Sequence, residues 1–133
     1  MVIAAGQDSA VLDSSVLIDF SRGHEAAVCC IETGPPSRFV VHPVSAAELL
    51  KGSKSRAELR ALDELLDRFD RIRCQPQDFD HCVALVRRFS LSHGVGWPDC
   101  LIAATAIRLG LPIVTLNDKH FKVFKGLKVR RPY

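Results

Sequence analysis

The sequence predicts an α/β fold in which helices cover both faces of a central, mainly parallel sheet. Short runs of β-branched residues alternate with helical patterns along the whole chain, which is the order expected for parallel strands joined by helices. At 133 residues, with 47% hydrophobic and 25% charged residues, the composition suits one globular domain spanning 1–133. No repeat, low-complexity tract or internal linker interrupts it.

The first half of the chain predicts two strands and three helices. The strands are "SAVLDSS" (9–15) and "RFVVHP" (38–43), and the helices are "SVLIDFSRG" (15–23), "HEAAVCCIETG" (24–34) and "SAAELLKG" (45–52). We expect the first two helices to stop at Gly23 and Gly34. Ser45 is a candidate N-cap of the third, with Glu48 three residues later at capping-box spacing.

The second half predicts three helices and two strands. An amphipathic helix covers 54–69, a short strand follows in 70–76, and a further helix covers 77–94. An almost wholly apolar helix then opens at Pro98 and Asp99 and ends at Gly110, before the strand "PIVTLND" (112–118). The residues expected to face inward are Leu59, Leu62, Leu65, Leu66, Phe69, Phe79, Cys82, Leu85, Val86 and Phe89.

Three carboxylates stand where a parallel sheet collects ligands, outside the carboxyl ends of its strands. Asp13 leaves the first strand, Glu48 lies on the helix after the second strand, and Asp99 opens the apolar helix. Clustered carboxylates repel, so such a site normally holds a hard divalent cation. Oxygen ligands without His or Cys predict Mg²⁺ or Mn²⁺ rather than zinc.

Each of these residues also has a local structural interpretation. Asp13 is placed to cap the helix that begins at Ser14, and Glu48 to complete a capping box with Ser45. Asp99 lies in the first helical turn, where the helix dipole favours a negative charge and keeps the carboxylate ionised. Three coincident capping roles at strand exits are less probable than one shared site.

Other chemistries lack their sequence signatures. The five cysteines form no C-x-x-C pair, and an odd number of cysteines cannot all be paired in disulfides. This pattern predicts free, buried thiols in a reducing cytoplasm. No G-x-S-x-G or phosphate-binding glycine motif is present. His42 and His120 have no partner at metal spacing; we expect His42 to be structural and His120 to be a surface or helix-start residue. The start of the chain is unlike a signal peptide, and no apolar run reaches the roughly 20 residues of a membrane span.

The sequence resembles the PIN-domain ribonucleases, specifically the VapC toxins of type II toxin–antitoxin pairs. The resemblance spans nearly the whole chain and rests on "VLDSSVLIDF", "VSAAELLKG", "PDCLIAATAIRLGLPIVTLNDKHF" and "FKGLKVRRPY". It implies an α/β/α sandwich, a homodimer, and Mg²⁺- or Mn²⁺-dependent cleavage of RNA. It also implies a cognate antitoxin whose tail lies in the active-site groove.

Carried onto this chain, the resemblance makes Asp13, Glu48 and Asp99 the catalytic and metal-binding acids. Ser15 and Thr115 match the small hydroxyl residues near the metal. The fourth acidic position is open between Asn117 and Asp118. Strand alternation would turn Thr115 and Asn117 to one side, and Asp118 is a candidate N-cap for the short helix "DKHF".

The basic residues are concentrated at the end of a chain whose net charge is only +3. They are candidates for contacts with RNA phosphates, although a charged edge strand that resists aggregation explains them equally well. These residues are Lys122, Lys125, Lys128, Arg130 and Arg131.

Two other functions remain open. A receiver-type signalling domain has the same kind of sheet, with acidic residues at the strand ends, but it needs a phosphorylatable Asp after the third strand. The only candidate there is Asp78, which comes after a Pro and is a poor one. A PIN fold that binds RNA or a partner without cutting is the stronger alternative, although all three acids are present.

Overall fold

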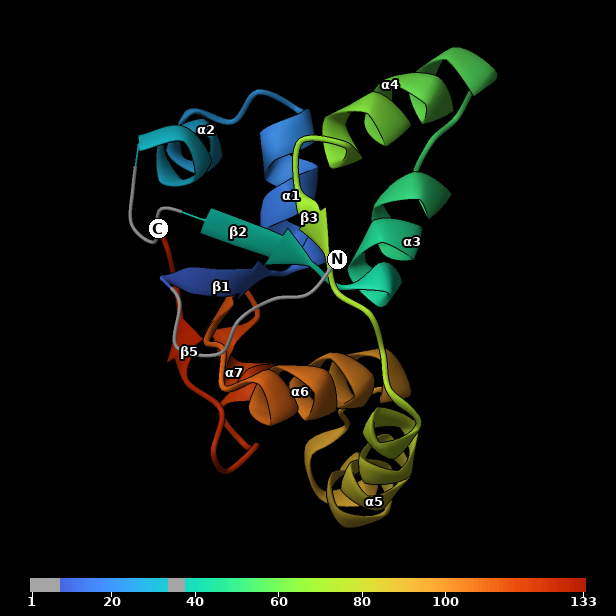
Figure 1. Ribbon diagram of the computed structural model, residues 1–133, viewed down its shortest axis with the longest axis vertical. Coiled ribbons are helices and arrows are strands. Elements are labelled where there is room, and N and C mark those ends of the chain that lie inside the picture. Colours follow the sequence, from blue (N-terminus) through green and yellow to red (C-terminus); the bar gives the residue numbers. More distant parts are fainter. Residues whose placement is uncertain (1–7, 34–37) are drawn as a thin grey trace.

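The computed structural model describes residues 8–33 and 38–133, in which strands and helices alternate (Figure 1). The strands are β1 (Ser9–Leu12), β2 (Arg38–Val41), β3 (Asp70–Arg71), β4 (Ile113–Val114) and β5 (Val129–Arg130). The helices are α1 (Ser14–Ser21), α2 (Glu25–Thr33), α3 (Pro43–Lys51), α4 (Arg56–Leu66), α5 (Pro76–His93), α6 (Trp97–Leu109) and α7 (Asp118–Phe121). The predicted α/β alternation is therefore confirmed.

The strands form one 5-stranded sheet in the order β3-β2-β1-β4-β5, and every neighbouring pair is parallel. β1 lies in the middle, with Val11 opposite Val40 of β2 on one side and Ile113 of β4 on the other. Because all strands run the same way, Asp13, His42 and Thr115 leave the sheet at one common edge. That edge carries the candidate site.

Helices cover both faces of the sheet. α1 to α4 lie on one face and α5 to α7 on the other (Figure 1). Alternate residues of β1 serve the two layers: Ala10 and Leu12 join the core beneath α1, α3 and α4, whereas Val11 joins the core around α6. A strand buried on both faces explains why this run contains no polar alternation.

α6 is the most deeply buried helix, because it lies between the sheet and α5. Its residues from Cys100 to Ala106 are all buried. It ends as predicted at Gly110, whose φ of 68° lies in the left-handed region that glycine adopts without strain. The helix therefore holds Asp99, in its first turn, rigidly against the sheet edge.

The start of α3 differs from the prediction. The helix begins at Pro43 and its N-cap is His42, whose Nδ1 accepts a hydrogen bond from the Val44 backbone at 3.0 Å. Ser45 is buried inside the helix, and its hydroxyl has no hydrogen-bond partner among the described residues. The capping box of Ser45 and Glu48 is therefore wrong, which leaves Glu48 without that local role.

Two side chains expected in the core lie at the surface. Leu59 of α4 is 38% exposed and Phe79 of α5 is 52% exposed, whereas Leu62, Leu66, Cys82 and Leu85 are buried as predicted. The predicted stop at Gly34 lies outside the described residues.

The five cysteines are free, as predicted, but only Cys82 and Cys100 are buried, and Cys29 is exposed. None of the helices described is long and apolar enough to cross a membrane.

Candidate active site

Asp13 is fixed at the exit of β1 by two hydroxyl groups. Its side chain is 2% exposed, and its Oδ2 accepts hydrogen bonds from Ser15 Oγ at 2.9 Å and from Thr115 Oγ1 at 2.8 Å. Although Asp13 is the N-cap residue of α1, its side chain makes no capping hydrogen bond. The capping interpretation is therefore wrong for this carboxylate, which faces the loop after β4.

The same two hydroxyls join the start of α1 to the exit of β4. Ser15 Oγ accepts from the Leu116 backbone N–H at 3.1 Å, and Thr115 Oγ1 accepts from the Asn117 backbone N–H at 2.9 Å. Each hydroxyl thus donates one hydrogen bond to Asp13 and accepts one from a backbone amide, so both its donor and an acceptor site are satisfied. Ser15 and Thr115 lie beside Asp13, where the resemblance placed them.

Glu48 and Asp99 approach Asp13 from α3 and α6. Burial, followed by the charges of Asp13 and Glu48, raises the pKa of Asp99 to about 6. Burial and the charge of Asp13 also raise the pKa of Glu48, against the lowering effects of the Ser14 side chain and Lys51. The helix dipole therefore does not keep Asp99 strongly acidic, because burial and repulsion outweigh it. The three predicted acids therefore lie at the same edge of the sheet, near enough for their charges to affect one another.

This donor set fits a hard divalent cation in its chemistry. All three groups are carboxylates that repel one another, and a cation such as Mg²⁺ relieves that repulsion. Within the described part of the chain, no three His, Cys, Asp or Glu side chains are already gathered as a metal-binding group. Glu48 is exposed and can rotate, so closing a coordination shell requires movement of side chains and not of the fold.

His120 belongs to the site and was not predicted there. Its Nδ1 lies 3.7 Å from Asp99 Oδ2, and its proximity lowers the pKa of that carboxyl against the stronger effects of burial and repulsion. The sequence places His120 at the start of a short helix, and no spacing rule connects it with Asp99. The link is tertiary, through the packing of α7 on α6.

The local structure at the fourth ligand position differs from the prediction, because neither the strand alternation nor the N-cap role of Asp118 is found. β4 ends at Val114, so strand alternation does not extend to Asn117, which is the exposed N-cap residue of α7. Asp118 is the first residue of α7 and not its cap. Its carboxylate contacts Arg131 Nη1 at 3.0 Å and Lys122 Nζ at 3.3 Å, and hydrogen bonding from Arg131 leads the effects that lower its pKa.

The predicted basic tail is divided by these contacts. Lys122 and Arg131 pair with Asp118, and Arg131 also donates to the Leu116 carbonyl at 2.8 Å. Arg130 lies in β5, one of the two edge strands of the sheet, and Lys125 and Lys128 are exposed in the residues that precede it. The edge-strand interpretation is therefore supported by position, and contact with RNA stays a prediction for Lys125, Lys128 and Arg130.

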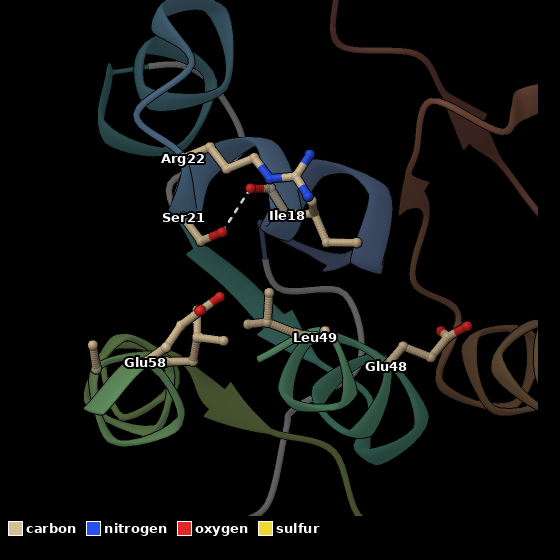
Figure 2. Close-up of a pocket in the computed structure, with 9 residues that line it drawn as sticks. Ile18, Ser21, Arg22, Glu48, Leu49 and Glu58 are labelled. Carbon is tan, nitrogen blue, oxygen red and sulfur yellow. Dashed lines mark hydrogen bonds between the residues drawn. The ribbon is translucent and has the colours of Figure 1, made fainter. Parts of the chain in front are cut away.

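A cavity of about 340 Å³ lies between α1, α3 and α4, and one of the three acids, Glu48, lines it. Figure 2 shows Glu48 and Glu58 on opposite sides of Leu49, with Arg22 at the end of α1 and its guanidinium beside Ile18. The residues that line this α1–α3–α4 cavity are Ile18, Ser21, Arg22, Glu48, Leu49, Gly52, Glu58, Ala61 and Leu62. Glu48 is thus shared between the cavity and the acidic site.

Comparison with known proteins agrees with this geometry. Residues 10–127 match the PIN domain family. Ribonuclease VapC10 of Mycobacterium tuberculosis is 38% identical over 128 residues, covering 89% of this chain and 90% of the relative. A toxin–antitoxin complex from Klebsiella pneumoniae contains a chain with a TM-score of 0.76 at 27% identity, covering 93% of this chain and 98% of that one.

A DNA-bound VapBC structure from Salmonella typhimurium has the same fold, with a TM-score of 0.74 at 24% identity over 93% of this chain and 97% of that one. The family match extends from β1 to the residues just before β5, and so includes Asp13, Glu48 and Asp99. The chain therefore belongs to the PIN-domain family, as a VapC ribonuclease of the toxin–antitoxin type.

Proposed function

We propose that this VapC-family ribonuclease hydrolyses RNA phosphodiesters with Mg²⁺ or Mn²⁺ held by Asp13, Glu48 and Asp99. The observation that carries the proposal is the placement of Asp13 after β1, Glu48 in α3 and Asp99 in α6 at one edge of the sheet, where burial and the charges of Asp13 and Glu48 raise the pKa of Asp99. When bound, the metal lowers the pKa of water and stabilises the charge that develops on phosphate oxygens. A receiver-type domain is not supported, because Asp78 is occupied by Arg108.

The chain's own residues supply positioning. Ser15 and Thr115 hold Asp13 Oδ2, which leaves Oδ1 as the oxygen directed to a ligand. Asp99 is held by the rigid first turn of α6, and Glu48 completes the set from α3. Asn117, at the rim, is our candidate for a fourth ligand, and Asp118 is a weaker one because it already pairs with two cations.

A cognate antitoxin neutralises the enzyme, in this proposal, by covering the three carboxylates. Support comes from the similar folds found in toxin–antitoxin complexes. We place the reaction in the cytoplasm, where both RNA and free thiols such as Cys82 and Cys100 persist.

We further propose a homodimer through the exposed face of α5. Phe79 and Val83 are 52% and 49% exposed on this face, and Cys82 contacts the carbonyl of Trp97, which is itself 61% exposed. Asp80 and Arg87 stand two turns apart on the same side of the helix. A second copy packed antiparallel pairs each Asp80 with the other copy's Arg87, so the face is self-complementary.

The direct test is cleavage of single-stranded RNA by the purified chain. We expect activity with Mg²⁺ or Mn²⁺, none with EDTA, and none for Asp13→Asn or Asp99→Asn proteins whose circular dichroism matches the wild type. Activity that survives EDTA or either substitution contradicts the metal-dependent mechanism. RNA binding without cleavage at any metal concentration indicates the alternative, a PIN fold that binds without cutting.

A further inference from the structure

The acidic site has to hold a polyanion, and its own carboxylates repel one. RNA phosphates next to the cleaved one therefore need cations nearby, because a bound divalent ion offsets only the charge of the carboxylates that hold it. The cations that serve this purpose must lie beside the acids and must not already be engaged in ion pairs.

Several basic side chains fail the second condition. In the described residues, Arg38, Arg68 and Arg108 pair with carboxylates, and so do Lys122 and Arg131 of the predicted tail. Two of the five tail residues are thus held by Asp118, which weakens the tail as a phosphate-binding surface. Lys125, Lys128 and Arg130 remain candidates, but further phosphate contacts are needed closer to the acids.

Arg22 and Lys51 meet both conditions. Arg22 lines the α1–α3–α4 cavity together with Glu48, and its guanidinium lies over α1 beside Ile18 (Figure 2). Lys51 stands three residues after Glu48 in α3, a spacing that puts the two side chains on neighbouring parts of one helix surface. Both cations are exposed, and neither makes an ion pair within the described part of the chain.

We propose that Arg22 and Lys51 form a phosphate-binding rim that holds the RNA backbone on the Glu48 side of the site. Glu48 is the common point: it belongs to the acids, lines the cavity with Arg22, and neighbours Lys51. A strand lying across the three acids then continues over α3 toward the end of α1. The contacts are to phosphate, so they position RNA of any sequence and do not select bases.

This inference rests on the proposed nuclease function, but its test measures binding and not cleavage. The binding of single-stranded RNA is measured with the Asp99→Asn protein in EDTA, where we expect no cleavage. The dissociation constant is determined at a series of salt concentrations. Each lost phosphate contact lowers the slope of log K against log salt by about 0.7 for a single strand. We expect Arg22→Gln with Lys51→Gln to reduce the slope by about 1.4.

The matched control is Arg56→Gln with Arg60→Gln, which also removes two exposed cations that have no ion pair in the described chain. These residues lie on the side of α4 turned away from Glu58 and Leu62, which line the cavity. We expect their slope to stay at the value of the parent protein. Arg22→Lys with Lys51→Arg, which keeps both charges, should also retain it.

An unchanged slope in the Arg22 and Lys51 variant, or an equal loss in the control, overturns the inference. So does a variant that binds RNA normally but no longer binds its antitoxin, because the rim then serves a protein partner. If the Arg22 and Lys51 substitutions lower the salt slope as expected but the wild type never cleaves RNA, the proposed nuclease function is wrong and the phosphate-binding rim is still supported.

Discussion

Thr115 donates a hydrogen bond of 2.8 Å to Asp13 across a sequence separation of 102 residues. This contact joins the exits of the two neighbouring strands β1 and β4, and the Thr115 hydroxyl accepts the Asn117 backbone N–H in return. The orientation of the first acid thus depends on a hydroxyl that is distant in sequence and adjacent in space.

Replacing Thr115 with valine should reduce both the activity and the stability of the protein. Valine keeps the shape but leaves Asp13 Oδ2 with one hydroxyl partner and the Asn117 N–H with none, at a cost of about 1–3 kcal/mol in unfolding free energy. We expect metal affinity or cleavage to fall about 10- to 100-fold, as is typical when a group that orients a metal ligand is lost. Urea denaturation and metal titration measure the two effects.

Thr115→Ser is the control, since it keeps the hydroxyl and should retain most of the activity. A valine variant with wild-type kinetics would show that Asp13 needs no support from Thr115.

The fourth ligand position is tested by comparing Asn117→Ala with Asp118→Asn. Because Asp118 is paired with Arg131 and Lys122, we expect its amide variant to keep metal affinity and to loosen the end of the chain. Asn117→Ala should weaken metal binding instead. Calorimetric titration without RNA reports the affinity, and limited proteolysis reports the loosening. A larger loss of metal affinity in Asp118→Asn would make Asp118 the fourth ligand.

The buried pair of Asp78 and Arg108 predicts a dependence of stability on pH. Burial favours the neutral form of Asp78, but hydrogen bonds from Arg108 and from the Gln75 backbone outweigh it and hold its pKa below the usual value. A lowered pKa means that the pair stabilises the fold at neutral pH, and that this stabilisation is lost as pH falls below about 4.

Asp78→Asn should therefore lower the unfolding free energy by about 3 kcal/mol at pH 7, and by clearly less at pH 3. Urea midpoints at the two pH values, with the exposed Asp63→Asn as control, measure the difference. An equal loss at both pH values would mean that the charge of Asp78 contributes nothing.

The proposed homodimer interface on α5 predicts that one substitution should break the dimer and a compensating one should restore it. Val83→Glu puts a charge at the centre of the α5 face and should yield monomers in light scattering, whereas His81→Glu, two residues earlier and well around the helix, should leave the dimer intact. Asp80→Arg should also give monomers, and adding Arg87→Asp should restore the dimer by reversing every pair. Dimers that persist in Val83→Glu would move the interface elsewhere.

The fold was predictable because its strong signals are local. The alternation of strands and helices, the Gly110 stop and the buried apolar helix each depend on neighbouring residues, and each is confirmed. Glu48 and Asp99 were expected near Asp13 because a parallel sheet sends every strand exit to one edge, and their role as metal ligands stays a prediction. The α3 start failed because a histidine, His42, provides the cap that Ser45 was expected to provide.

Tertiary pairing was beyond such rules. His120 contacts Asp99 only because α7 packs on α6, and Asp118 binds Arg131 only because β5 returns beside β4. Phe79 shows a similar limit. Helical periodicity places it among the apolar residues of α5, but the packing of α5 on α6 decides which of these residues are buried.

The position of β1 in the middle of the sheet has a consequence for synthesis on the ribosome. β1 is made early, yet one of its two neighbours, β4, is made about a hundred residues later. Asp13 therefore emerges long before Asp99 and Thr115, and an unfinished chain lacks the groups that complete its site. Long-range pairing of this kind also slows folding. A chain so connected cannot bring its three carboxylates together until nearly all of its described domain has left the ribosome.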